Sequence, residues 1–591
     1  MSQDEQSLSS ERQTSETTPD IGRRRLLQGA LLGATALGAG GLAGCDSGAS
    51  ASPAVGNPSP PVQPPISNTP GSTFGPLPAA RADEAAQLKI AAAEANRAQH
   101  TASAQPNNGD EARYSNFIGS FSKTLAHNAI GEVNETSYLG YLDALESGDP
   151  DRFDAIIVGN PTLAGRIGLV SPQAAFSFET AGLDGQSPRL PNAPTFESAE
   201  TAAEMTEIYW YALCRDVPFS RYDADPLIAA AVADLNALSR SDIFPGVSGA
   251  VTPQTIFRSA LPGSTTGPLV SQFLLQPFFF GAFEIDGLYR RVAEGSVNDF
   301  MTSFDEYLAI QRGAPPVNPN VFDTTRTNLY SMRQLGEFVH VDNPVQSGLY
   351  AATILFELGA FDATLPLQDS AVEDGFVDFG KADITALVTR GPRHALTAAW
   401  YQKWLVHRRL RPENYAARIN ISRRALANYP IHPDVLNSDA LARIDAAQSN
   451  ADDRGLLPMG YPEGCPAHPA YPGGHSTFSA AAATMCKAFY DENFVFPNPV
   501  QPSADGLSLE PYTGPDLTVG GELNKLVGNI THGRDGAGMH WRSDGVGNFA
   551  GEEIAISILQ DYSRTYNERF DGFRLTRFNG TPIRIVDGQV L

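Results

Sequence analysis

Cysteine and basic residues are both scarce in this chain. Its 591 residues include only four cysteines, and 42 lysines and arginines stand against 66 aspartates and glutamates. So sparse a set of cysteines excludes a disulfide scaffold, and no two of them have the spacing of a zinc site. The formal net charge of -24 argues against a nucleic-acid partner, which would require a basic surface.

Two of the cysteines, Cys465 and Cys486, bracket a glycine-rich segment, YPGGH at residues 471–475. An oxidising compartment would permit a disulfide between them. Two buried free thiols are an equally good interpretation, so the sequence leaves the pairing open.

Alternating strand patterns are also scarce, and helical patterns take their place. Alanine content and apolar spacing predict amphipathic helices in the segments 83–100, 199–219, 225–239, 347–361 and 396–405. Proline- and glycine-containing connections separate them, notably 245–268 and 503–517, and a terminal hairpin is expected at 581–590, with Asp587 and Gly588 as its turn. We therefore expect a mainly α fold, a large helical bundle with long loops and minor β structure.

The N-terminal residues are typical of an export signal. Three arginines, Arg23 to Arg25, precede a mild apolar run that ends in Leu42-Ala43-Gly44-Cys45. Such a run resembles a Tat signal, and its end resembles a bacterial lipobox that would lipidate Cys45. An ordinary cleaved signal is the alternative. We expect a signal at 1–45, a disordered linker rich in proline, serine and glycine at 46–78 and one mainly α domain at 79–591, in a periplasmic or cell-surface protein.

Lys403 and Arg411 are the first candidates for chemistry. Eight positions on one helix amount to two turns plus about 80°, so both cations could converge on one anion. Pro412 should place Arg411 near the end of that helix. The alternative is a solvated basic face, because Arg408 and Arg409 are close by.

His475 follows Gly473 and Gly474 and opens a segment with strong helical character. A helix N-terminus offers free N–H groups to an anion, and a histidine there can act as general acid or base. The alternative is a glycine turn with a capping histidine. His468, seven residues earlier, is a weaker candidate for the same pocket.

The segment 533–544 supplies Arg534, His540 and Asp544. Gly536 and Gly538 disfavour a helix between Arg534 and His540, so we expect Arg534 on a loop and His540 at the start of the next helix. Asp544, four residues after His540, can bind one ring N–H and raise the basicity of the other nitrogen. The alternative is a surface ion pair.

Together these three segments resemble the vanadium-dependent haloperoxidases, especially the algal-type bromoperoxidases. That family shares its core with bacterial acid phosphatases and type 2 phosphatidic acid phosphatases. The resemblance covers roughly residues 100–580 and includes the segments 252–278, 340–361 and 400–413. It implies the helical-bundle fold of that family, a vanadate cofactor and an assembly of identical subunits. Hydrogen peroxide, a halide, most simply bromide, and an organic acceptor would be the partners.

The resemblance also implies a role for each candidate. Lys403, Arg411, Arg534 and the Gly474 amide would hold vanadate oxygens, His540 would be the metal ligand, backed by Asp544, His475 would handle the proton of peroxide, and His468 would be a further pocket histidine. The family often has serine where this chain has Gly473. The missing hydroxyl would cost on the order of 1.5–3 kcal/mol of vanadate binding.

Two rival functions use the same residues. An acid phosphatase would use His540 as nucleophile and His475 as general acid, and a lipid-anchored oxyanion-binding protein would need no turnover. The sequence also suggests two minor features: an influence of Gln402 on halide selectivity, and a calcium site in the acidic loop 369–378.

Overall fold

The fold is built around one central helix, α14 (Gly474–Phe489). This computed structural model describes residues 77–99, 104–162, 165–293 and 299–591, and residues 76–591 form one unit. Helix α14 is apolar on nearly every side, with Ala480 to Ala483 all buried, which is the pattern of a helix enclosed by others. The expected signal, the lipobox at Cys45 and almost all of the linker lie outside the described residues.

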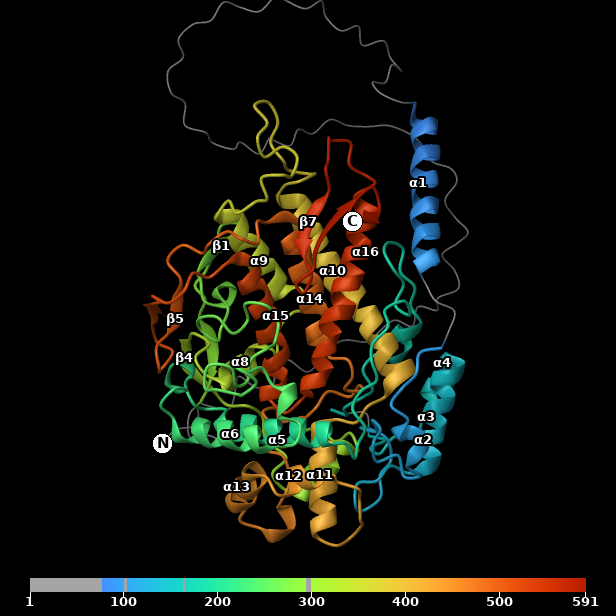
Figure 1. The fold of residues 1–591 in the computed structure, drawn as a ribbon. Coiled ribbons are helices and arrows are strands. Elements are labelled where there is room, and N and C mark those ends of the chain that lie inside the picture. Colours follow the sequence, from blue (N-terminus) through green and yellow to red (C-terminus); the bar gives the residue numbers. More distant parts are fainter. Residues whose placement is uncertain (1–76, 100–103, 163–164, 294–298) are drawn as a thin grey trace, which may run out of the picture. The chain divides into compact units, whose positions relative to one another are not determined.

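Five helices surround α14 or pack on its neighbours (Figure 1). They are α8 (Met332–Phe338), α9 (Gln346–Glu357), α10 (Lys381–Tyr401), α15 (Val519–Gly536) and α16 (Gly547–Tyr562). Small side chains allow the close approach of α14 and α16, since a Cβ on Gly551 would overlap the carbonyl oxygen of Thr477. The mainly α prediction is confirmed.

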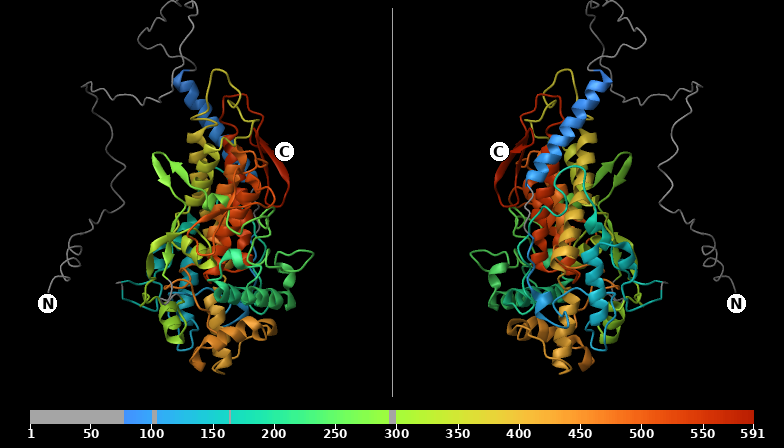
Figure 2. Two further views of the ribbon diagram at one scale, coloured as in Figure 1. Left: turned by 90° about the vertical axis from the view of Figure 1, so that its left-hand side faces the viewer. Right: turned by 90° about the vertical axis from the view of Figure 1, so that its right-hand side faces the viewer.

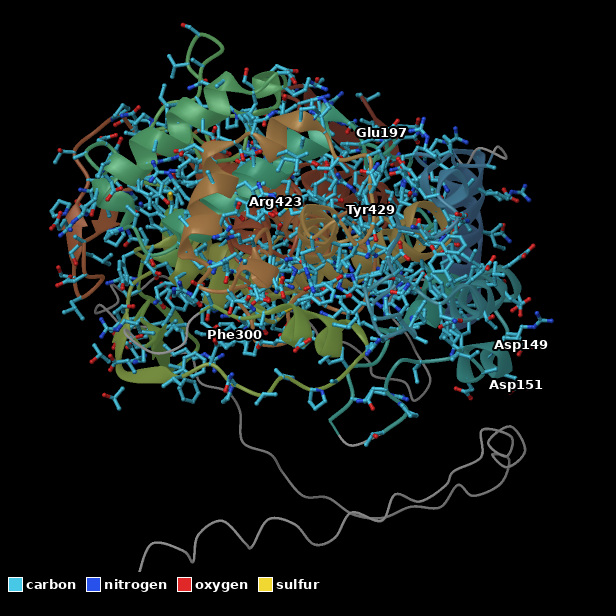
Figure 3. The ribbon with its side chains drawn as sticks, turned by 90° about the horizontal axis from the view of Figure 1, so that it is seen from below. Asp149, Asp151, Glu197, Phe300, Arg423 and Tyr429 are labelled. Atoms are coloured by element: carbon cyan, nitrogen blue, oxygen red, sulfur yellow. The ribbon has the colours of Figure 1, made fainter. Side chains whose placement is uncertain are left out.

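Further helices cover this bundle. The other α-helices are α1 (Pro78–Gln99), α2 (Asp110–Arg113), α3 (Glu135–Ser147), α4 (Pro150–Asp154), α5 (Ala199–Cys214), α6 (Pro226–Ala237), α7 (Phe304–Gln311), α11 (Pro412–Arg423), α12 (Pro433–Leu436) and α13 (Asp439–Ala447). Short 3-10 turns are η1 (Pro172–Phe176), η2 (Phe219–Arg221), η3 (Ser241–Ile243), η4 (Gln272–Leu274), η6 (Ala451–Asp453) and η7 (Arg542–Val546), and η5 (Gln402–His407) is a π-helical turn. Seen from below, Arg423 at the end of α11 and Tyr429 in the next loop lie on the face that α11–α13 form (Figure 3).

The strands form small antiparallel sheets at the periphery. They are β1 (Phe278–Phe280) with β2 (Phe283–Ile285), β3 (Tyr289–Val292) with β4 (Phe322–Thr327), β5 (Val500–Pro502) with β6 (Leu509–Pro511), and β7 (Phe573–Thr576), β8 (Pro582–Val586) and β9 (Gln589–Val590). Val586 pairs with Gln589 across Asp587 and Gly588, which both have positive φ. This two-residue turn confirms the terminal hairpin.

Helix α1 forms where the alanine content predicts it, but its expected apolar face is hardly used. Ala92 is its only buried residue, and Figure 2 shows the helix along the outside of the bundle. Its alanines favour the helical backbone even without burial. No helix in the described ranges is long and apolar enough to cross a membrane.

The glycine contacts of the central helices generate a matched pair of stability predictions. Gly551→Ala should lower the free energy of unfolding by about 1–3 kcal/mol, because the added methyl group forces α16 away from α14. Gly140→Ala on α3 should raise it by about 0.5–1 kcal/mol, because no atom lies within 4 Å of its added Cβ. Urea unfolding of both variants measures this, and equal effects would contradict the close-packing account.

Candidate functional site

The candidate residues converge on the loop 468–470, which the side chains of Lys403 and Arg411 both bind. Lys403 donates from Nζ to the carbonyls of Pro469 and Ala470, at 2.8 Å each. Arg411 donates from Nε to the carbonyl of His468 at 3.0 Å and from Nη2 to its ring Nδ1 at 2.9 Å. The solvated basic face considered for this segment is therefore wrong.

Lys403 and Arg411 do not share one helix, contrary to the expectation. Helix α10 ends in the π-helical turn η5, Arg408 takes a positive φ, and the chain runs extended to Arg411. Arg411 is the N-cap of α11, with Pro412 at its first position. Proline favours that position and an extended residue before it. The turn also places Trp404 in a small apolar core beside α3.

The pair of His540 and Asp544 forms the buried centre of the site. The Nδ1 atom of His540 lies 2.7 Å from Oδ2 of Asp544. The Nε2 atom of His540 lies 2.9 Å from Nη1 of Arg411. A guanidinium can only donate, so Nε2 accepts and holds the lone pair while Nδ1 carries the proton. Both residues are buried, which excludes the surface ion pair. Nε2 is thus the nitrogen whose lone pair faces the site, where it accepts from Arg411.

The positions of Arg534 and His540 reverse the sequence expectation. Arg534 lies in the last turn of α15, which continues through Gly536, whereas His540 lies in the connection before η7. Gly533 and Gly536 lie within the helix because α15 packs closely on α8 there. A Cβ at either position would meet side chains of α8. Gly538, with φ of 86°, follows the end of the helix.

Helix α14 begins at Gly474, one residue before the expected start at His475, with Gly473 as N-cap. Gly473 has φ of -66° and ψ of 129°, an ordinary extended conformation, so its backbone does not require glycine. Its amide donates to the carbonyl of Asp544 at 2.8 Å. The Gly474 amide donates to no atom in the described part of the chain.

His475 and Arg534 meet at one carbonyl that the sequence did not reveal. Val339, just after α8, accepts from Nη1 of Arg534 at 2.9 Å and from Nε2 of His475 at 3.1 Å. The carboxylate of Asp342 lies 3.1 Å from the same Nε2. Val339 and Asp342 lie about sixty residues before Lys403, and no local pattern marks them.

The site holds an excess of buried positive charge. Burial lowers the pKa of Lys403 well below its usual value, and Arg411 and Arg534 lower it further. Burial also lowers the pKa of Arg411 to about 10 and those of His468 and His540 well below their usual value. Among the described residues, no carboxylate lies at ion-pair distance from Lys403, Arg411 or Arg534.

An oxyanion fits this set of donors. Nε of Arg534 is buried without a partner in the described structure, and the Gly474 amide is also free of one there. Lysine and arginine side chains, a helix N-terminus and a histidine lone pair together suit vanadate or phosphate.

Arg409 forms a second layer that sequence reasoning missed. Its Nη2 lies 2.8 Å from Oε2 of Glu204, its Nη1 lies 3.3 Å from Oδ1 of Asp544, and its guanidinium lies over the ring of Trp541. Burial raises the pKa of Asp544, and Arg409 is the main group that opposes this rise. Arg408 pairs instead with Glu111, at 2.6 Å.

The remaining candidates have simpler outcomes. His468 stacks on Trp400 with ring centroids 4.9 Å apart. Gln402 donates to Gln105 and to the carbonyl of Pro188. Cys465 and Cys486 are buried free thiols, so the disulfide alternative is wrong. The described residues contain no group of three or more acidic, histidine or cysteine side chains that could hold a metal ion, in the loop 369–378 or elsewhere.

Comparison with known proteins places this site in a family. A model of the VCPO second helical-bundle domain matches residues 384–568, which include every candidate from Lys403 to Asp544. A vanadium-dependent bromoperoxidase of Ascophyllum nodosum is 34% identical over 524 residues, covering 85% of this chain and 92% of the relative. This chain belongs to the vanadium haloperoxidase family.

Two further relatives agree. A vanadium-dependent bromoperoxidase of Corallina pilulifera is 32% identical over 569 residues, covering 81% of this chain and 94% of the relative. The homohexameric structure of the second vanadate-dependent bromoperoxidase of A. nodosum superposes with a TM-score of 0.82 at 29% identity, covering 89% of this chain and 94% of that one. The family's helical-bundle fold therefore extends over most of the chain.

The second layer generates a prediction with a matched control. Arg409→Met should destabilise the protein by about 3–5 kcal/mol, because Glu204 is left buried without its partner. Adding Glu204→Gln should recover part of that stability, whereas vanadate binding stays weak because Asp544 has lost Arg409. Urea unfolding and equilibrium dialysis measure the two effects.

The control is the neighbouring pair, changed in the same way as Arg408→Met with Glu111→Gln. This pair does not touch Asp544, so vanadate binding should stay close to that of the wild type. Equal vanadate affinity in the two double variants would show that Arg409 has no influence on the site.

Proposed function

We propose that this protein is a vanadate-dependent haloperoxidase that oxidises bromide with hydrogen peroxide to hypobromous acid, which then halogenates organic acceptors. The observation that carries this proposal is the buried cluster of Lys403, Arg411 and Arg534, which lacks a carboxylate partner in the described structure and faces a histidine lone pair. Membership of a family whose named relatives are bromoperoxidases supports the choice of reaction.

Vanadate would be held by residues from η5, the start of α11, α14, α15 and the connection before η7. Lys403, Arg411, Arg534 and the Gly474 amide would bind its oxygens through charge-assisted hydrogen bonds, and Nε2 of His540 would bind the metal. Bound vanadate supplies a Lewis acid that activates peroxide towards halide. The proton that His540 donates to Asp544 fixes the tautomer that this bond requires.

His475 is suited to accept a proton from hydrogen peroxide. Its Nε2 faces two acceptors, Val339 O and Asp342, so this nitrogen carries the proton and Nδ1 holds the lone pair. Burial lowers the pKa of His475 below its usual value, although Asp342 opposes this. The ring is therefore neutral at pH 7 and able to act as a general base. Asp342 fixes its orientation.

The assembly and location belong to the same proposal. The A. nodosum structure is homohexameric, which supports a homo-oligomer here. Arg23 to Arg25 and the sequence before Cys45 support export by the Tat route and a lipid anchor at Cys45.

The decisive assay is bromination of a phenol dye by vanadium-free protein before and after addition of orthovanadate. We expect activity to appear with vanadate and phosphate to compete, because the three cations distinguish poorly between oxyanions of like shape and charge. Hydrolysis of a phosphate monoester without vanadate, and no bromination with it, would favour the acid phosphatase. Vanadate binding without either reaction would indicate an oxyanion-binding protein.

Gly473 generates a second test. A Cβ on Gly473 would lie 2.9 Å from Oγ of Ser476 and 3.2 Å from the carbonyl oxygen of Asp544. Gly473→Ser alone should therefore disturb the turn by steric overlap. In a Ser476→Ala background the main overlap is removed, and Gly473→Ser should tighten vanadate binding by about 1 kcal/mol through one added hydrogen bond to a charged group.

The comparison is between Ser476→Ala and the double variant, measured by equilibrium dialysis with vanadate. Circular dichroism of both variants checks that the fold is intact. Weaker binding in the double variant would show that a side chain at position 473 does not contact the oxyanion.

A further inference from the structure

A second concave site lies between three peripheral segments, outside the oxyanion site. It is a groove of about 460 Å³, a volume within the range of small-molecule sites. Its walls come from η2, the connection 245–268 and the β5–β6 region. We call it the Arg258 groove, and its lining includes the aromatic and aliphatic side chains of Phe219, Tyr222, Leu269, Val270 and Tyr512.

The guanidinium of Arg258 is only partly used by the protein. Its Nη1 donates to the carbonyls of Ser264 and Pro268, each at 3.2 Å, and its Nη2 donates to that of Gly267 at 2.9 Å. A guanidinium has five N–H donors. The Nε–H and one Nη2–H therefore have no acceptor among the described residues. Nε–H together with an Nη2–H is the edge through which a guanidinium can bind a carboxylate in a bidentate pair.

The charge of Arg258 is also poorly compensated. No carboxylate lies at ion-pair distance from it in the described structure. Burial lowers its pKa to about 10, and the more distant Glu522 is the main group that opposes this fall. Asp223 lines the same groove, but it is exposed and accepts a hydrogen bond from Gln254 at 2.5 Å. Burial disfavours the charged form of the guanidinium, and an anion bound at Arg258 would stabilise that form again.

Aromatic rings define the shape of the rest of the groove. The ring of Tyr512 lies over Gly267, whose added Cβ would be 3.3 Å from the ring's Cζ and Oη atoms. Phe219 and Tyr222 meet edge to face, with centroids 5.7 Å apart. Aromatic walls favour a planar aromatic ligand through stacked and edge contacts.

We infer that the Arg258 groove binds a small aromatic carboxylate, with its carboxylate on the free guanidinium edge of Arg258 and its ring among these aromatic side chains. Phenolic acids belong to this class and are also organic acceptors for electrophilic bromination, and to that extent the biological use rests on the proposed function. One hydrogen bond links the backbone of the groove to the segment that carries His540. Nη1 of Arg542, two residues after His540, donates to the carbonyl of Arg258 at 3.1 Å.

Binding is measured by calorimetry on the full chain saturated with orthovanadate, so that the oxyanion site cannot take the ligand. The probes are 4-hydroxybenzoate and the neutral 4-hydroxybenzamide. We expect the benzoate to bind at least about tenfold more tightly than the amide, since the neutral amide cannot form the bidentate charged pair. Equal affinities would overturn the inference.

Two variants locate the site. Ser220→Trp fills the groove from its exposed rim without touching the contacts of Arg258, and should abolish benzoate binding. Arg258→Lys should weaken it by about tenfold, because lysine cannot form the bidentate pair. The control Arg569→Lys, at an exposed position, should leave it unchanged. Wild-type affinity in Ser220→Trp would overturn the inference even if Arg258→Lys disturbs its loop, and neither result depends on bromination.

Discussion

Uncompensated positive charge in the interior is the constraint on which this site depends. Arg411 and Arg534 both lower the pKa of buried Lys403, and Arg534 lowers that of buried Arg411. Carbonyl oxygens rather than carboxylates accept most of the hydrogen bonds from these three cations. Carbonyl oxygens stabilise buried cations only in part, so binding of an anion at this site would stabilise the folded protein further. The same arrangement would be a defect in a protein that bound no oxyanion.

The surrounding structure holds these cations in place through a few well-paired groups. Glu413 accepts from the Cys465 amide at 2.7 Å and pairs with Lys123 at 3.1 Å, and Lys123 also donates to the carbonyl of Cys465. This buried pair fixes the start of the loop that Lys403 and Arg411 bind. On the opposite side, Arg409 and Glu204 hold Asp544. Each partner is paired, so the excess charge is confined to the site.

The sequence predicted which side chains come together better than it predicted the backbone that carries them. The lysine, arginine and histidine side chains at Lys403, Arg411, Arg534, His475 and His540 point to an oxyanion by chemistry alone, and α14 begins where its glycines and alanines indicate. The sequence reading failed where packing overrides propensity. Arg534 lies in a helix although glycines flank it, because α15 packs so closely on α8 that larger side chains would not fit at those glycines. The π-helical turn η5 cannot be inferred from a helical periodicity.

Some of the site is invisible to sequence reasoning for a different reason. Val339 contributes only a carbonyl oxygen, which every residue has, and Asp342 is distant in the chain from His475. Arg409 was indistinguishable from a surface arginine until Glu204 and Asp544 were seen around it. Such residues are identified by their neighbours in space, and those neighbours come from α5, η7, α14 and α15.

The central claim is that the buried charge selects a multiply charged oxyanion. The most direct measurement is the thermal stability of the vanadium-free protein with orthovanadate, phosphate, nitrate or chloride at equal ionic strength. A ligand that binds only the folded state raises the Tm according to its concentration relative to its Kd. The account predicts a clear rise with vanadate and phosphate and little change with the two monovalent anions. Equal shifts with all four anions, or none with vanadate, would contradict it.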